Sequence, residues 1–224
     1  AFEQVRNSVG YPHLNVKIGA THGGISVGED GASHQCCEDF ALMRSIPGMV
    51  VMSPADDVEA RAMVKAAYEH VGPVYMRFGR AGVPVFHDGE NFQFQIGKGE
   101  VLTEGTDVAI IANGDTVRLA LEAAEVLAGK GISARVLDMH TIKPLDVEAV
   151  KACVNDIGKI ITVEDHNIIN GLGGAVCEVV AEMGKGQVKR VGIQDQFGQS
   201  APYERLLAIN GITVENIVAQ AENW

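Results

Sequence analysis

The chain has 224 residues, enough to bury a substantial core in one large or two small domains. Its hydrophobic content of 46% and charged content of 21% are those of a soluble globular protein. The formal net charge of −11 argues against a nucleic-acid-binding surface and against an anionic membrane as partner. No apolar run reaches ~18 residues and no secretory leader is visible, so we expect a cytoplasmic protein.

The four cysteines lack the spacing of a metal site, and the adjacent pair Cys36–Cys37 cannot readily bond to itself. Reduced thiols are the interpretation that fits a cytoplasmic chain.

The first residues predict a helix that has already begun. Phe2, Val5 and Val9 share one helical stripe, yet no capping residue or turn precedes them. We therefore interpret the chain as a fragment, or as one whose leading segment was lost.

Strands and helices then alternate through the first half. Strands are predicted at 16–20, 49–52 and 74–78, and helices at 38–45 and 58–70. The polar group at Ser53–Asp56 predicts the cap of the second of these helices. Strands separated by helices imply parallel βαβ units, here in a sheet that we expect to lack its first strand.

A change of pattern marks the predicted domain boundary. Between residues 86 and 100, Phe86, Phe92 and Phe94 alternate with polar residues around a turn at Asp88. This predicts a linker with a hairpin, separating a first domain at 1–85 from a second at 101–224.

The second half predicts a complete domain. Strands are expected at 108–112, 134–138, 160–164 and 188–193, with helices reaching from about 116 to 130 and over 144–154, 171–183, 202–207 and 214–222. Asp115 or Thr116 is expected to cap the first of these helices. Right-handed crossovers between the strands would give a small, mostly parallel three-layer α/β domain.

The segment Thr21–Gln35 concentrates chemically active side chains directly after a predicted strand. It holds His22, His34 and the acidic pair Glu29–Asp30 among several glycines. Ligands bind at the carboxyl ends of strands in open α/β sheets, and imidazoles with a carboxylate could bind a sugar-like substrate and move protons. From composition alone, a glycine-rich turn without function is an equally good interpretation.

Arg80 follows another predicted strand, at the same expected edge of the sheet. A planar guanidinium binds a phosphate in two places at once, although an arginine beyond a strand is also common on any surface.

The string T-H-x-x-I-x-V-G-E-D-G-x-x-H-Q, from Thr21 to Gln35, resembles the signature of the pyrimidine-binding domain of the transketolase family. Members of that family use thiamine diphosphate. Pro54–Asp56 also matches, and the segments 139–146, 163–175 and 195–199 resemble the family's C-terminal domain. The resemblance covers essentially the whole chain and is greatest to the C-terminal subunit of a split transketolase, here without its N-terminal segment.

The resemblance implies site residues. Asp30 would contact a substrate hydroxyl, His34 would bond the carbonyl end of the sugar, and His22 would help to hold the substrate. Arg80 would bind the sugar phosphate. Phe2, the aromatic residue left near the position where the family stacks on the pyrimidine, is assigned to cofactor contact.

The resemblance also implies partners. Thiamine diphosphate would be shared with an N-terminal subunit that carries the diphosphate-binding domain, and Mg²⁺ would be held through that partner and not by this chain. The chain would form a homodimer, and its C-terminal domain would lie mostly outside the active site. The glutamate that activates the cofactor would lie upstream of the position matched by Ala1.

The predicted activity is transfer of a two-carbon ketol unit between sugar phosphates. The alternatives are a deoxyxylulose-phosphate synthase, the β subunit of a 2-oxo-acid dehydrogenase, and a non-catalytic dimerisation or regulatory subunit. Gly114–Asp115 does not continue as a diphosphate-binding motif, and we interpret Gly171, Gly173 and Gly174 as close helix–strand packing and His166 as structural.

Overall fold

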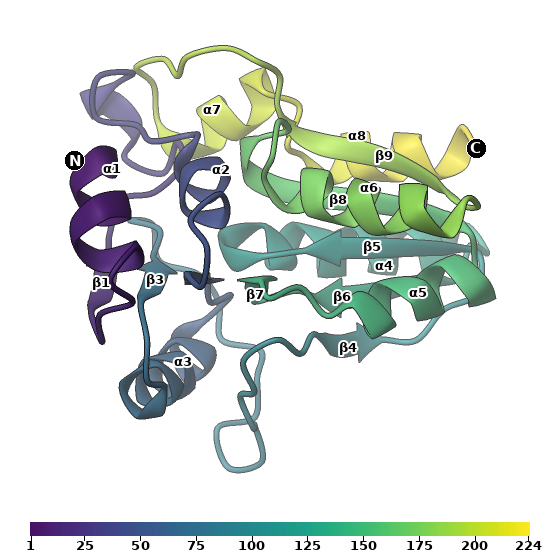
Figure 1. Cartoon of the computed structure of the whole chain (residues 1–224). Coiled ribbons are helices and arrows are strands. Elements are labelled where there is room, and N and C mark those ends of the chain that lie inside the picture. The colour runs from purple at the N-terminus through teal and green to yellow at the C-terminus, as the bar shows by residue number, and fades with distance from the viewer.

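Two mostly parallel sheets organise the chain, whose 224 residues are all described by a computed structural model (Figure 1). The first has the order β1-β3-β2-β7 and the second the order β4-β6-β5-β8-β9. The first sheet consists of β1 (Lys17–Ala20), β2 (Val50–Met52), β3 (Val74–Arg77) and β7 (Thr141–Lys143). The second consists of β4 (Glu100–Thr103), β5 (Val108–Ala112), β6 (Ala134–Asp138), β8 (Lys159–Asn167) and β9 (Gln187–Ile193).

The helices follow the predicted order, with ends that differ by a few residues. They are α1 (Phe2–Gln4), which continues as a π-helical segment (Val5–Gly10), α2 (Asp39–Arg44), α3 (Asp57–Glu69), α4 (Val117–Gly129), α5 (Val147–Asp156), α6 (Leu172–Met183), α7 (Tyr203–Ile209) and α8 (Val214–Glu222). Short 3₁₀ turns, η2 (Gly28–Asp30) and η3 (Gly114–Thr116), lie in the loops. None of these helices combines the length and the apolar character needed to cross a bilayer.

The second sheet is the middle layer of a three-layer domain, as predicted. Successive residues of a strand point to opposite faces, so Ile110 packs into one core and Ile111 into the other. Helices α4 and α8 cover the first of these cores, and α5 and α6 cover the second. Ile25 and Cys37, from the first half of the chain, belong to the core under α4 and α8. The two halves therefore share one apolar interior.

Two strands were not predicted from the sequence. β4 runs antiparallel to β6 at the edge of the second sheet, and β7 runs antiparallel to β2 and adds a strand from the second half to the first sheet. Both are short, and β4 is only partly buried, so neither shows a long apolar run or a clear period of two.

The predicted hairpin between 86 and 100 is wrong. Residues 84–99 contain turns but no paired strands, and Figure 1 shows them as a loop beneath the two sheets. The backbone N–H groups of Phe86 and His87 donate to Asp56 Oδ2, at 3.0 and 2.9 Å. Because these donors bond to a side chain of the first domain, they are not available to a neighbouring strand.

Of the two predicted helix caps, one is confirmed. Asp56 Oδ1 accepts the N–H of Glu59 at 2.9 Å and caps α3. Neither Asp115 nor Thr116 caps α4, because the Thr116 hydroxyl donates to the carbonyls of Asn113 and Val163 instead.

Candidate active site at the edge of the first sheet

The pairing of β1 with β3 places the segment Thr21–Gln35 and Arg80 at one edge of the sheet. The strands are parallel neighbours, with Ala20 opposite Arg77, so their carboxyl ends lie together. The N–H of Gly23 donates to the carbonyl of Phe78 at 3.1 Å and continues this pairing past the ends of the strands. We call Thr21–Gln35 the site loop.

Arg80 is attached to the site loop while its side chain is exposed. Its N–H donates to Ser26 Oγ at 2.9 Å, and Ser26 Oγ donates to the carbonyl of Gly23 at 3.0 Å. The Arg80 Nη1 donates to the carbonyl of Val27 at 3.2 Å. A guanidinium has five N–H donors, so most of them are left for an anion.

Both histidines of the site loop are exposed with one ring nitrogen engaged. His22 Nδ1 lies 2.9 Å from Thr21 Oγ1, and His34 Nδ1 lies 3.1 Å from Ser33 Oγ. Each neighbouring hydroxyl leaves Nε2 without a partner in the chain. His22 has φ = 64°, in the left-handed region that few non-glycine residues adopt, and such strain is concentrated at functional sites.

Asp30 ends the 3₁₀ turn η2 and is exposed, with no hydrogen-bond partner for its carboxylate. No hydrogen bond or ion pair joins any two of His22, Asp30, His34 and Arg80. The fold thus brings these four side chains to one edge without satisfying them by one another, which leaves their polar atoms free for a ligand.

The C-terminal domain holds the far end of the site loop, through the segment between β9 and α7. Gln35 Nε2 donates to the carbonyls of Gly28 and Gln199, at 3.2 and 2.9 Å. Ser200 Oγ donates to the carbonyl of Glu29 at 2.6 Å. Beside these contacts a cavity of about 440 Å³ opens between the two segments. The expectation that this domain lies mostly outside the site is therefore corrected for residues 194–201.

A buried arginine supports the base of the site loop. Arg77 is 5% exposed; its Nη2 donates to the carbonyl of Asp165 at 2.6 Å, and its Nε lies 3.3 Å from Asp39 Oδ2. Tyr75 donates its hydroxyl to the same Asp39 oxygen at 2.8 Å, and the guanidinium lies 4.5 Å from the centre of the Phe40 ring. Burial opposes the charge on Arg77, but Asp39 and Asp165 outweigh it and raise the pKa of the guanidinium.

Asp165 connects this buried group to the site loop. Its carboxylate accepts the N–H of Ile25, at 3.0 Å from Oδ1 and 3.2 Å from Oδ2. Burial raises the pKa of Asp165 to about 6, against the effect of Arg77. Gly24 has φ = 67°, and a Cβ there would lie 2.2 Å from Asp165 Oδ2, so only glycine fits this turn.

Sequence reasoning missed Asp39, Arg77 and Asp165 as site residues. The available signal was a charged residue within an otherwise apolar strand, as for Arg77 in β3 and Asp165 near the end of β8. A buried charge requires a partner, so such a position predicts a buried ion pair.

The glycines after β8 pack against a carboxylate, as predicted for helix–strand packing. Glu164 accepts the N–H groups of Leu172 and Gly173, at 2.6 and 2.8 Å, at the start of α6. A Cβ on Gly171 would lie 2.0 Å from Glu164 Oε2, and one on Gly173 would lie 2.8 Å from Thr162 Oγ1. These glycines therefore permit close approach of α6 to β8.

Phe2 lies beside the core of the first domain, packed against a cluster that includes Phe40 and Ile46. Its assignment to cofactor contact stays a prediction.

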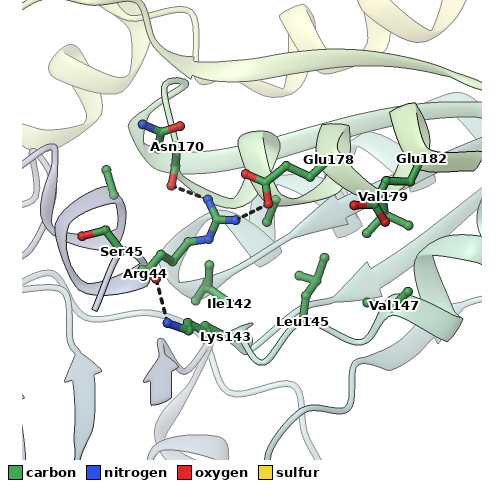
Figure 2. Close-up of a pocket in the computed structure, with 12 residues that line it drawn as sticks. Arg44, Ser45, Ile142, Lys143, Leu145, Val147, Asn170, Glu178, Val179 and Glu182 are labelled. Atoms are coloured by element: carbon green, nitrogen blue, oxygen red, sulfur yellow. Dashed lines mark hydrogen bonds and ion pairs between the residues drawn. The ribbon is translucent and has the colours of Figure 1, made fainter. Parts of the chain in front are cut away.

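The largest cavity, about 600 Å³, lies away from the site loop, between α2, β7 and α6 (Figure 2). Its two cations are already engaged. Arg44 donates to the carbonyl of Asn170 at 2.7 Å and pairs with Glu178 at 2.8 Å, and Lys143 donates to the carbonyls of Arg44 and Ile46. An anion would have to displace these partners, so we do not assign the phosphate site here.

Comparison with known proteins identifies the family. Residues 1–85 match the transketolase pyrimidine binding domain and residues 97–217 match the transketolase C-terminal domain. The chain belongs to the transketolase family. Membership implies dependence on thiamine diphosphate.

Similar proteins include components of split enzymes. A putative transketolase C-terminal section from Methanocaldococcus jannaschii is 48% identical over 97% of this chain and 68% of that protein. The second of the subunits of an apulose-4-phosphate transketolase from Phocaeicola vulgatus is 40% identical over 99% of this chain and 70% of that protein. A 1-deoxy-D-xylulose-5-phosphate synthase from Geobacter sulfurreducens is 42% identical over 99% of this chain but only 35% of that protein.

A solved structure described as a split gene transketolase, an inactive β4 tetramer, has the same fold. It superposes with a TM-score of 0.92 and 47% identity, covering 100% of this chain and 71% of that one.

Proposed function

We propose that this chain is part of the C-terminal subunit of a thiamine-diphosphate-dependent transketolase, which transfers a two-carbon ketol unit between sugar phosphates. The observation that carries the proposal is the meeting of four exposed polar side chains at one sheet edge. His22, Asp30 and His34 come from the site loop and Arg80 from the end of β3.

Each of these side chains suits one part of a sugar phosphate. The free guanidinium donors of Arg80 match phosphate oxygens, and His22 can donate from the same edge. The Asp30 carboxylate accepts a hydrogen bond from a hydroxyl in one configuration and not from its epimer. His34 titrates near neutral pH when unperturbed and can donate to a carbonyl or accept a proton from a hydroxyl.

These groups fit the substrate better than they fit the cofactor. They are exposed and polar, and Arg80 is cationic, whereas a pyrimidine ring needs an apolar surface to stack on and Phe2 packs beside a core cluster. We therefore derive no step through thiamine diphosphate from this chain. We propose that an N-terminal subunit holds its diphosphate and Mg²⁺, and that the side chains described here bind and orient the sugar.

The decisive experiment is reconstitution. The complete subunit would be mixed with its N-terminal partner, thiamine diphosphate and Mg²⁺, and transfer between sugar phosphates would be followed. Formation of deoxyxylulose phosphate from pyruvate and glyceraldehyde phosphate would be measured in parallel, because the similarity to the synthase favours that second candidate. Ketol transfer alone supports the proposal; product only from pyruvate supports the synthase; no turnover in either assay supports a non-catalytic subunit.

We further propose that the chain forms a homodimer and does not bind thiamine diphosphate without its partner. Light scattering after size exclusion tests the first statement, and calorimetry with the isolated chain tests the second. A stable monomer would contradict the homodimer, and micromolar binding of thiamine diphosphate to the chain alone would contradict the shared site.

A further inference from the structure

A second group of buried polar side chains lies where α3, the linker and β6 meet. Glu59 comes from the first turn of α3, His87 from the linker and Asp138 from the end of β6. Glu59 and Asp138 are fully buried and His87 is 8% exposed. One ligand atom from each lies within 4.8 Å of the other two. We call these three residues the junction cluster.

Most polar atoms of the junction cluster have no hydrogen-bond partner. These atoms are Glu59 Oε1, both carboxylate oxygens of Asp138, and both ring nitrogens of His87. The other oxygen of Glu59 accepts the N–H of Ala55 at 2.6 Å. Buried polar atoms are almost always paired, because an unpaired one costs about 1–3 kcal/mol. Five such atoms facing one point indicate a missing partner.

The charges around the junction cluster are also unbalanced. Asp56 Oδ2 lies 3.0 Å from His87 Nδ1, and Glu100 Oε2 lies 3.3 Å from His87 Nε2. The other imidazole nearby is His140, whose Nε2 lies 3.9 Å from Glu59 Oε1. No lysine or arginine pairs with any of the four carboxyl groups. Anionic oxygens gathered in a buried space repel one another unless a positive species lies between them.

We infer that Glu59, His87 and Asp138 bind one divalent transition metal ion, with Glu100 as a fourth ligand from the solvent side. One imidazole nitrogen with carboxylate oxygens is a donor set suited to Zn²⁺ or Mn²⁺. Bonds of about 2.0–2.2 Å to such an ion require the ligand atoms to close in from their present spacing. The 43% exposure of the Glu100 side chain provides a path for the ion to enter.

The surroundings of His87 support this assignment. Asp56 lies beside Nδ1, which leaves Nε2 directed toward Glu100 and, at 3.9 Å, toward Asp138 Oδ2. A carboxylate that holds the far nitrogen of a histidine is the usual arrangement behind a metal ligand. Phe86 and Phe92 flank the ring, with centroids 4.7 and 4.4 Å away, and fix its orientation.

The ion would connect the two domains. Glu59 belongs to the first domain, His87 to the linker and Asp138 to the second sheet. Binding to the folded arrangement and not to the unfolded chain would stabilise the junction by mass action. The competing explanation is a proton shared between the Glu59 and Asp138 carboxyl groups, with no metal involved.

The test measures metal content and binding on the complete subunit. Elemental analysis of protein purified without chelator, then calorimetry with Zn²⁺, Mn²⁺ and Mg²⁺ after chelation, should give one Zn²⁺ or Mn²⁺ per chain. Asp138→Asn and His87→Gln should each weaken binding at least about tenfold. Asp57→Asn, an exposed carboxylate on the same helix, and His70→Asn, an imidazole elsewhere, should leave it unchanged.

The same titration followed by melting should raise the Tm of the wild type and not that of His87→Gln. If Asp138→Asn does not fold, His87→Gln alone decides the question. A folded wild-type subunit that binds neither Zn²⁺ nor Mn²⁺ at millimolar concentration, or one that binds only Mg²⁺, overturns the inference. So does binding that survives both ligand substitutions.

Discussion

The carboxylate of Asp165, near the end of β8, accepts the backbone N–H of Ile25 in the site loop, at 3.0 Å from Oδ1. The two residues are 140 positions apart and belong to different halves of the chain. The geometry of the site loop therefore depends on the C-terminal domain as well as on β1.

Gly24→Ala tests this dependence. A Cβ at residue 24 would lie 2.2 Å from Asp165 Oδ2 and 2.4 Å from Arg77 Nη2, at a φ that alanine adopts with difficulty. We expect a loss of about 1–3 kcal/mol in the free energy of unfolding, measured by urea denaturation. Gly19→Ala is the control, because a Cβ there meets nothing within 4 Å. Equal effects of the two substitutions would contradict the tight packing described.

Arg80→Ala tests the phosphate contact. In the reconstituted enzyme we expect KM for phosphorylated sugars to rise about 10- to 150-fold, with a much smaller change in kcat. A phosphate anchor removes binding shared by the ground and transition states when it is lost. Arg61→Ala removes an exposed arginine of α3 and should change neither constant. A rise of the same size for unphosphorylated sugars would remove the main support for a sugar-phosphate substrate.

Asp30→Ala tests recognition of a hydroxyl. We expect the variant to discriminate less between sugars that differ in one hydroxyl configuration, because the carboxylate no longer selects between them. The measurement is the ratio of kcat/KM for two epimeric substrates. Glu29→Ala, which removes the neighbouring exposed carboxylate, should preserve the wild-type ratio. If both variants keep the ratio, Asp30 does not read the hydroxyl.

Glu164→Gln tests the buried carboxyl at the start of α6. Burial raises the pKa of Glu164 to about 7, against the N–H groups of Gly173 and Leu172, whereas an unfolded glutamate ionises near its ordinary value of 4.5. Between these two values the folded chain retains a proton that the unfolded chain releases. The contribution of this group to stability is therefore full below pH 4.5, falls as pH rises, and is lost above about pH 7.

The variant has no such titration but loses one acceptor for two N–H groups. We expect it to melt below the wild type at pH 5, with the gap narrowing by pH 8. Melting curves at pH 5, 6, 7 and 8 for both proteins measure this difference. A gap that stays constant over this range would mean that the folded pKa of Glu164 is not raised.

The order of the regular elements could be predicted from sequence because each carries a local signal. Val108–Ala112 is a continuous apolar run, and Asp56 is a recognisable cap in front of α3. β7 has no such signal, because it is a strand only through its pairing with β2, a partner distant in sequence. The linker was misjudged for the same reason, since Asp56 takes its backbone donors.

The candidate site was predictable in its exposed residues and not in its supports. His22, Asp30, His34 and Arg80 belong to segments whose composition or resemblance drew attention to them. Arg77 and Asp165 act through each other and through Ile25, and these contacts exist only once β3 and β8 are in place. A single sequence carries no local sign of such pairs beyond a charge within an apolar strand.

The position of β7 in the first sheet has a consequence for synthesis on the ribosome. β7 ends at Lys143, which is 66 residues (143 minus 77) after β3 ends at Arg77. Until those residues emerge, β2 presents an open row of backbone donors and acceptors on the side that β7 later covers. A nascent chain stalled within this interval is therefore exposed to pairing with other unfinished chains, and a chaperone that shields this edge would raise the yield of folded protein.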